Sequence, residues 1–239
     1  MYYGIIHAIP VHWRQGLINE VFDPDHGLGF ESILNVPNMS RVIYQQIIST
    51  VYTVPTSCSK WNLSFPDIAE SWNIIFRIPF TSVRESKIQY FQYRFLHRAL
   101  GTNSLCHRMN LIENPSCTFC GNQNETLDHL FWECGITSNF ILDVEQRFLG
   151  RQFVFTKQDI FFGYTLLLKH PYNFLIFYMK YYIFEKKINK GNPLIDEFLN
   201  KFKFHFRVEK YISEQKSSRK GLNMNEFKEA FSELPFLFN

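Results

Sequence analysis

The stretch from Cys117 to Cys134 reads "CTFCGNQNETLDHLFWEC" and decides how the rest of the chain is interpreted. It contains three cysteines and one histidine in the order Cys-x2-Cys-x8-His-x4-Cys, at Cys117, Cys120, His129 and Cys134. Two cysteines that are separated by two residues can hold a metal ion from one tight turn. Gly121 follows directly and allows the left-handed backbone that such a turn usually requires.

These four side chains are typical ligands of zinc, which prefers a tetrahedron of thiolates and imidazoles. Three thiolates and one imidazole fill that tetrahedron, so a structural Zn²⁺ is expected rather than a catalytic one. His129 and Cys134 are expected on a regular helix that begins near Thr126. Glu125 lies four residues before His129 and is expected to accept a hydrogen bond from its free ring N–H.

The alternative interpretation of this stretch is a chance grouping of buried cysteines. Two further cysteines, Cys58 and Cys106, lie outside the pattern and are interpreted as small buried residues or free thiols. The total of five cysteines is odd, and the opening "MYYGIIHAIPVHW" lacks the features of a secretory signal. A reducing intracellular compartment, nuclear or cytoplasmic, is therefore expected, where cysteine clusters bind metal more often than they form disulfides.

The composition indicates a packed, mainly helical protein. Hydrophobic residues make up 46% of the 239 residues, which supports a core and argues against wholesale disorder. The most apolar region, 160–184, is interrupted by charged residues and a proline, and so lacks the ~20 apolar residues of a membrane span. The expected fold is mainly α: an irregular helical domain with one small CCHC zinc knuckle, residues 117–134.

Local signals predict individual helices. A capping box from Ser82 to Glu85 predicts a helix that starts at Ser82 and ends near Gly101, and Ser64 is expected to cap an earlier helix. Further helices are expected over 158–169, 172–188, 193–214 and 223–232, with a connector over 146–158. The expected regions are 1–63 with short helices and loops, 64–150 with the zinc site, and 151–239 with aromatic-rich helices and a basic tail.

Positive charge is concentrated in two blocks. The net charge is only +3. Residues 77–108 carry six Lys or Arg against one acidic residue, and residues 180–220 carry eleven against five. Two basic blocks on an otherwise acidic chain indicate a polyanionic partner, RNA or DNA. The alternative is two solvated helix faces.

The expected helix over 82–100 divides into two faces. At 100° per residue, Ile88, Phe91, Phe95 and Ala99 form one stripe. The opposite side carries the candidate nucleic-acid contacts Tyr90, Arg94, His97 and Arg98. The arginines are expected to contact phosphates, and the two rings can stack on the bases of a single strand.

A second pattern is a weaker alternative. Asp67 after a proline, followed by Glu85 and Lys87, imitates the PD…ExK signature of metal-dependent nucleases. Such a site requires the three side chains to converge. Both carboxylates are better explained as acids in first helical turns.

Five stretches together resemble the C-terminal region of non-LTR (LINE-type) retrotransposon reverse transcriptases, over roughly residues 70–215. They are "WNIIFRIPF", "KIQYFQYRFLHRALGTNSL", "CTFC", "NETLDHLFWEC" and "IFFGY…NFLIFYMKYYIFEKK". That region includes the reverse-transcriptase zinc-binding domain. The family positions fall on Phe91, Gln92, Tyr93, Arg94, His97, Arg98 and Asn103, and in the knuckle on Cys117, Cys120, Glu125, Thr126, His129, Leu130, Phe131 and Cys134.

The resemblance implies a role next to the polymerase, holding RNA and target DNA during target-primed reverse transcription. Polymerase chemistry requires paired aspartates that hold two metal ions, and the chain contains no Asp-Asp pair. A non-enzymatic fragment is therefore expected, with RNA or DNA and the polymerase core of a retrotransposon protein as partners and no role for a membrane. The alternative function is a protein-interaction scaffold that docks on that polymerase core.

Overall fold

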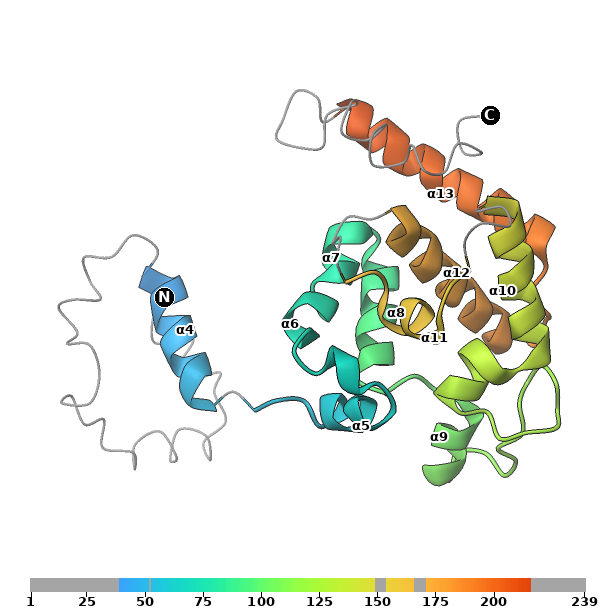
Figure 1. Ribbon diagram of the computed structural model, residues 1–239, viewed down its shortest axis with the longest axis horizontal. Helices are drawn as coiled ribbons and strands as arrows, with labels where there is room; N and C mark the ends of the chain where they lie inside the picture. The colour runs from blue at the N-terminus through green and yellow to red at the C-terminus, as the bar shows by residue number, and fades with distance from the viewer. Residues whose placement is uncertain (1–38, 52, 149–153, 166–170, 216–239) are drawn as a thin grey trace, which may run out of the picture. The chain divides into compact units, whose positions relative to one another are not determined.

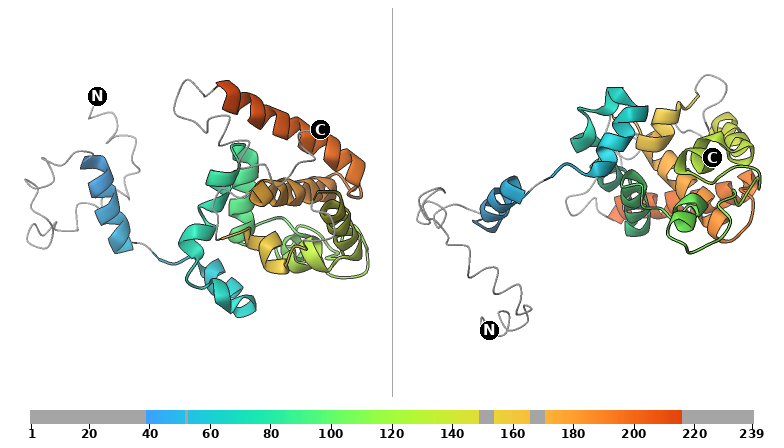
Figure 2. Two further views of the ribbon diagram at one scale, coloured as in Figure 1. Left: turned by 45° about the horizontal axis from the view of Figure 1, so that its top comes forward. Right: turned by 90° about the horizontal axis from the view of Figure 1, so that it is seen from below.

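The computed structural model describes residues 39–51, 53–148, 154–165 and 171–215 (Figures 1 and 2). The chain divides into two units, Met1–Val54 and Pro55–Asn239, and each is described by itself. Within the first unit the described element is helix α4 (Met39–Val51). The functional candidates all lie in the second unit.

The second unit is built from short helices followed by two long ones. In chain order these are α5 (Thr56–Ser64), η2 (Pro66–Ile68), α6 (Trp72–Ile75), α7 (Ile78–Ser82), α8 (Ser86–Leu96), α9 (Asn103–Arg108), η3 (His129–Glu133), α10 (Gly135–Phe148), α11 (Lys157–Phe162), α12 (Pro171–Ile188) and α13 (Ile195–Gln215). No strand occurs among the described residues, where one isolated bridge joins Ser116 and Asn124. The mainly helical prediction is confirmed.

Helix α12 lies at the centre of the second unit and packs against α7, α8, α11 and α13 (Figure 1). It is apolar around most of its circumference, and its residues from Phe174 to Lys180 are all buried. A helix that is apolar on all sides is stable only inside a core. Among the helices that the structure describes, none has the length and apolar character that crossing a membrane requires.

Trp61 joins the N-terminal helix of this unit to the core. Its side chain is fully buried, and its Nε1 donates a hydrogen bond to the backbone oxygen of Leu96 over 2.8 Å. Its ring stacks on Phe95 at 5.7 Å and meets the edges of Phe161 and Phe162 at 5.6 and 5.4 Å. Aromatic pairs of this kind add about 0.5–1.5 kcal/mol each beyond burial, so α5 is held firmly against α8 and α11.

Lys180 is a lysine buried at the centre of the core. It is fully buried, and its Nζ donates to Gln92 Oε1 over 2.8 Å and to the backbone oxygen of Phe161 over 3.0 Å. Both acceptors are neutral, and the ring centre of Phe95 lies 3.4 Å from Nζ. Burial holds the pKa of Lys180 well below its ordinary value of 10.5. A neutral amine fits these contacts, because its two N–H groups both have acceptors.

Replacing Lys180 with Met is expected to remove a pH dependence of stability. In wild type, the unfolded chain protonates this amine below pH 10.5 while the folded chain does so only below its depressed pKa. Between those two values the unfolded state binds one more proton, so stability rises with pH by about 1.4 kcal/mol per unit. Urea unfolding at several pH values checks this. Equal slopes in wild type and Lys180→Met would show that the folded protein keeps the amine charged.

The expected helix from Ser82 to Gly101 is wrong at both ends. Ser82 ends α7, and α8 begins at Ser86 with Glu85 before it. Glu85 makes no capping hydrogen bond, because its carboxylate accepts from the Tyr178 hydroxyl over 2.9 Å and also pairs with Lys87 and His205. The left-handed residue after the helix is Arg98, with φ of 55°, and not Gly101.

Of the other helix predictions, some are confirmed and some are wrong. Helices α12 and α13 confirm the predictions over 172–188 and 193–214 to within a few residues. The helix predicted from residue 158 ends at Phe162, because Gly163 adopts φ of 78°. Ser64 ends α5 and does not cap a new helix. Helix α10 was not predicted and runs into the expected connector. The helix predicted over 223–232 lies outside the described residues.

Candidate metal centre

A tight loop presents the first two cysteines. The Cys117 N–H donates to the Gln123 oxygen over 2.7 Å, and the Gly121 N–H donates to the Cys117 oxygen over 2.9 Å. Gly121 has φ of 72°, a conformation that side chains with a Cβ rarely adopt. The expected glycine turn after the Cys-x2-Cys pair is confirmed.

The second pair comes from a π-turn and not from the expected regular helix. Thr126 Oγ1 accepts from the His129 N–H over 3.0 Å and caps the segment as predicted. The Cys134 N–H then donates to the His129 oxygen over 2.8 Å, a bond that spans five residues. In an α-helix, side chains five residues apart project about 140° from each other. The wider π-turn, with extended backbone at Cys134, lets both side chains reach the same point.

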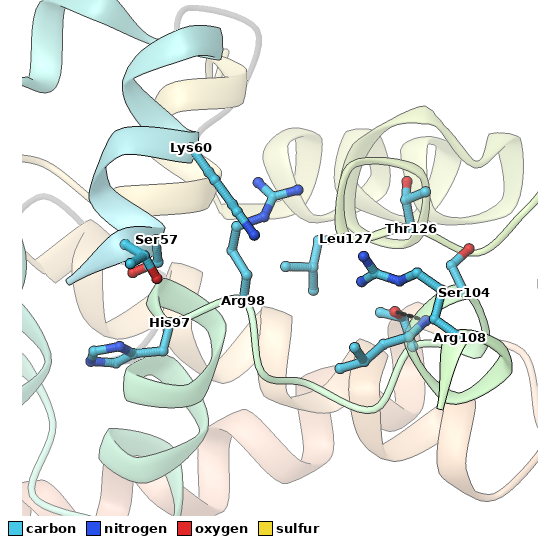
Figure 3. Close-up of a pocket in the computed structure, with 11 residues that line it drawn as sticks. Ser57, Lys60, His97, Arg98, Ser104, Arg108, Thr126 and Leu127 are labelled. Carbon is cyan, nitrogen blue, oxygen red and sulfur yellow. Dashed lines mark hydrogen bonds between the residues drawn. The ribbon is translucent and has the colours of Figure 1, made fainter. Parts of the chain in front are cut away.

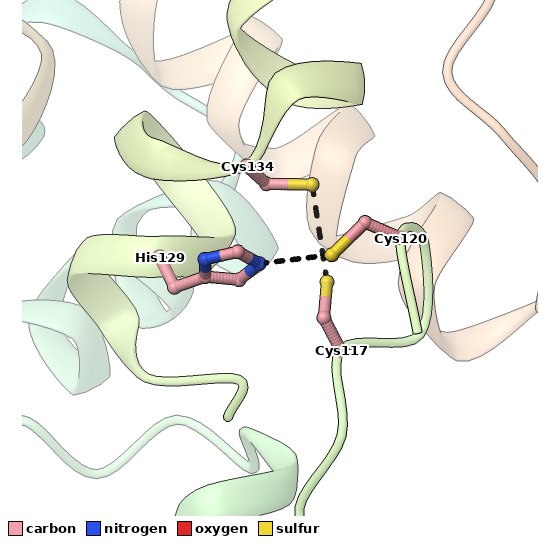
Figure 4. Close-up of side chains that lie close together, drawn as sticks. All are labelled: Cys117, Cys120, His129 and Cys134. Carbon is pink, nitrogen blue, oxygen red and sulfur yellow. Dashed lines mark hydrogen bonds between the residues drawn. The ribbon is translucent and has the colours of Figure 1, made fainter. Parts of the chain in front are cut away.

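The four side chains converge (Figure 4). Their ligand atoms all lie within 4.8 Å of one another. Cys117 Sγ and Cys134 Sγ are 3.9 Å apart, and Cys120 Sγ and His129 Nε2 are 3.3 Å apart. Zinc with bonds of about 2.3 Å to sulfur and about 2.0–2.1 Å to nitrogen requires separations of about 3.5–3.8 Å. The donor set and its spacing therefore fit a zinc ion.

The two thiols of the loop differ in acidity. Burial raises the pKa of Cys117 to about 12. The backbone N–H of Asn122, followed by His129, lowers the pKa of the more exposed Cys120 to about 6. The site thus offers one thiolate near neutral pH, and a bound cation would supply the charge that favours ionisation of the buried thiol.

Glu125 does not have the partner that was expected of it. Its Oε1 accepts from the Asn103 N–H over 2.9 Å, and its Oε2 accepts from the Thr118 N–H over 2.8 Å. His129 Nδ1 is buried and has no hydrogen-bond partner among the described residues. The prediction that Glu125 orients His129 is wrong in this structure, because both carboxylate oxygens face the backbone of α9 and the cysteine loop.

A buried ion pair connects the knuckle to the core. Glu125 is fully buried, and Lys187 Nζ of α12 lies 3.5 Å from its Oε1. Lys187 also donates to the backbone oxygen of Gly101. Asn103 adds a further link, since its Nδ2 donates to the Ser116 oxygen over 2.6 Å. These bonds fix the cysteine loop against α9 and α12, which holds the first ligand pair in place.

The four nucleic-acid candidates separate into two pairs. Tyr90 is 62% exposed, and the Arg94 guanidinium lies 5.8 Å from its ring centre while donating to the Ala99 oxygen. These two border a small pocket of about 220 Å³. His97 and Arg98 instead border another pocket of about 660 Å³. The single polar face predicted for residues 82–100 is divided, because α8 ends at Leu96.

His97 and Arg98 both have packing roles. The His97 ring lies 4.3 Å from the ring of Tyr93 and 5.4 Å from that of Phe76. Burial lowers the pKa of His97, which favours a neutral ring. The Arg98 guanidinium lies 4.2 Å above the ring of Trp61.

Residues 56–140 match the protein family described as zinc-binding in reverse transcriptase. The match extends from the first residue of α5 into α10 and includes all four residues of the metal cluster. Searches of curated proteins and of solved structures found no match. The folded, helical segment 56–140, with its convergent Cys3His cluster, is a reverse transcriptase zinc-binding domain.

Proposed function

We propose that this chain is a non-catalytic, zinc-binding part of a retrotransposon reverse transcriptase of the LINE type, and that it holds RNA or target DNA beside the polymerase. The observation that supports it most is the convergence of four ligand atoms within 4.8 Å inside a segment that matches the reverse transcriptase family. The LINE assignment rests on the resemblance of residues 70–215 to the C-terminal region of those enzymes.

Zn²⁺ is the proposed cofactor, held by the Cys3His cluster. Four protein ligands complete a tetrahedron, which suits a structural ion, because a catalytic zinc keeps a position for water. The ion would join the cysteine loop to the π-turn, two segments that the sequence separates by eight residues. The role of the metal is therefore to fix the surface around the knuckle.

Nucleic-acid holding is supported by a ring and a guanidinium on α8, inside the segment that matches the family. Tyr90 on α8 is 62% exposed and the partly exposed Arg94 guanidinium lies over its ring, and a ring and a guanidinium suit stacking and phosphate contact. The family resemblance places Arg94, His97 and Arg98 at family positions. Sequence-specific recognition is not part of the proposal.

The alternative from another class is a scaffold that docks on a polymerase core. Exposed apolar side chains such as Leu111 at 67% and Met109 at 60% would suit a protein partner. The nuclease alternative loses support from Glu85, whose carboxylate already binds Tyr178, Lys87 and His205.

Binding of the purified zinc-loaded chain to nucleic acid tests the proposal. Labelled single-stranded RNA and DNA are expected to bind in a filter assay, with affinity that falls steeply as salt rises. Magnesium or manganese is expected to yield neither primer extension nor nicked plasmid. Absence of oligonucleotide binding at low salt would favour the docking scaffold, and nicking that is lost in Asp67→Ala and in Glu85→Ala would favour the nuclease.

A further inference from the structure

A basic pocket of about 660 Å³ lies between α5, the loop after α8, α9 and the residues before η3 (Figure 3). Its cations come from three separate segments: Lys60 from α5, Arg98 from the loop and Arg108 from α9. The remaining lining residues are His97, two leucines and five serines or threonines. None of the described residues that line the pocket is acidic.

The residues that the structure describes neutralise little of the positive charge in this pocket. Neither Lys60 nor Arg108 forms an ion pair with any residue that the structure describes. Arg98 meets an acid only at the limit of an ion pair, with its Nη2 4.0 Å from Asp128 Oδ2. Asp128 in turn lies closer to Lys157, at 2.8 Å. Burial lowers the pKa of the Arg98 guanidinium, the Asp128 carboxylate opposes this shift, and the positive charge of Arg108 adds to it.

Two hydroxyl groups at the pocket also have no nitrogen or oxygen partner within the described part of the chain. Ser57 is 5% exposed and Ser104 is partly buried, and the Oγ of each lacks a nitrogen or oxygen partner among the described residues, with the thiol of Cys58 as the one polar group that acts on Ser57. A buried hydroxyl without a partner costs free energy, so such groups in a pocket indicate a ligand that can bind them. Ser57 lies in the first turn of α5, a nine-residue helix whose free N–H groups favour an anion.

Cations and hydroxyls together are the donor set that recognises phosphate. A phosphate carries strong acceptor oxygens, and arginine binds it through two parallel N–H groups. The volume lies within the range of ligand pockets and leaves space for a nucleoside beside the phosphate. The firm packing of Trp61 against α8 and α11 holds α5, and with it Ser57 and Lys60, in position.

We propose that this pocket binds a phosphate group, and that the phosphate belongs to the backbone of a single nucleic-acid strand. The assignment to a nucleic-acid strand rests on the proposed function, whereas the phosphate site rests on the pocket alone. Lys60 and Arg108 bind the phosphate oxygens, Ser57 and Ser104 donate hydroxyl hydrogen bonds, and Arg98 adds charge while remaining stacked on Trp61.

The phosphate site is tested with inorganic pyrophosphate on the full zinc-loaded chain, with amide chemical shifts as the readout. Pyrophosphate is expected to shift the amides of Ser57, Lys60, Ser104 and Arg108, relative to chloride at equal ionic strength. The double variant Lys60→Gln with Arg108→Gln should abolish these shifts while its other amides remain at wild-type positions. Shifts spread evenly over exposed cations such as Arg77, or no shifts, would overturn the site.

The source of the phosphate is tested with single-stranded RNA and DNA oligonucleotides. The same double variant should bind about tenfold more weakly, and its log–log salt slope should fall by up to about 1.4, since each contact on a single strand contributes about 0.7. The matched control is Arg77→Gln with Arg207→Gln, which removes equal charge from two exposed residues outside the pocket. An equal loss in this control would overturn the strand assignment.

The two arms separate failure of the site from failure of the proposed function. Pyrophosphate shifts at the pocket without oligonucleotide binding would retain the phosphate site and assign it to a free phosphate compound. Oligonucleotide binding that the pocket variant leaves unchanged would retain nucleic-acid holding and overturn the pocket as its site.

Discussion

Cys117→Ser is expected to lose the zinc ion and, with it, the ordered conformation of residues 115–135. The variant leaves three ligands, and metal binding at such sites is coupled to folding, with apparent free energies of about 10–16 kcal/mol in isolated zinc-finger peptides. Cys117 is buried and opens the loop that the knuckle depends on. Metal content per chain and hydrogen exchange of the knuckle amides are the measurements, and Cys134→Ser should behave alike.

Cys106→Ser is the matched control for that loss. Cys106 is a partly buried cysteine on α9 that lies outside the metal cluster. It should retain the full zinc content and the wild-type exchange pattern. Full zinc content in Cys117→Ser would show that the ligand set is wrong.

Glu125→Ala is expected to destabilise the protein by about 3–5 kcal/mol, the range for breaking a buried ion pair from one side. The substitution leaves Lys187 buried without its anion. It also removes the acceptor of the Asn103 and Thr118 N–H groups. Urea unfolding at saturating zinc measures the change in the free energy of unfolding.

Glu113→Ala provides the comparison for Glu125→Ala. Glu113 is exposed and forms no ion pair with a described residue, so its removal should change stability by no more than about 0.5 kcal/mol. Similar small effects of both substitutions would mean that Glu125 is solvated, and that the network from Asn103 to Lys187 does not hold the knuckle.

The metal ligands could be predicted from the sequence because their chemistry is local. Cys117, Cys120, His129 and Cys134 lie within eighteen residues, and the residue types alone indicate zinc. The π-turn that brings His129 and Cys134 together could not be predicted, since helical periodicity assumes a regular turn. The signal that was available is the spacing of five residues between His129 and Cys134, which does not fit one face of an α-helix.

The partners of Glu125 illustrate why the contacts that hold the metal centre in place were not predicted from the sequence. Its spacing from His129 suggested a contact within one helix. The structure instead joins it to Asn103, 22 residues away, and to Lys187 on α12. Such pairings depend on tertiary packing, which sequence periodicity does not contain.

Arg98 shows the same limit for the basic surface. Periodicity placed it on a helix face with Arg94, but α8 ends at Leu96, and Arg98 takes a left-handed conformation above Trp61. The pocket that it borders also needs Lys60 and Arg108, which come from different helices. The sequence indicated this basic pocket only through the positive charge of the segment 77–108.

X-ray absorption of the zinc in the purified chain tests the Cys3His centre most directly. Three sulfur neighbours at about 2.3 Å and one nitrogen at about 2.0–2.1 Å are expected, with one zinc per chain. That result would place Cys117, Cys120, Cys134 and His129 on a single closed site. A shell with fewer sulfurs, or with oxygen from water, would contradict it.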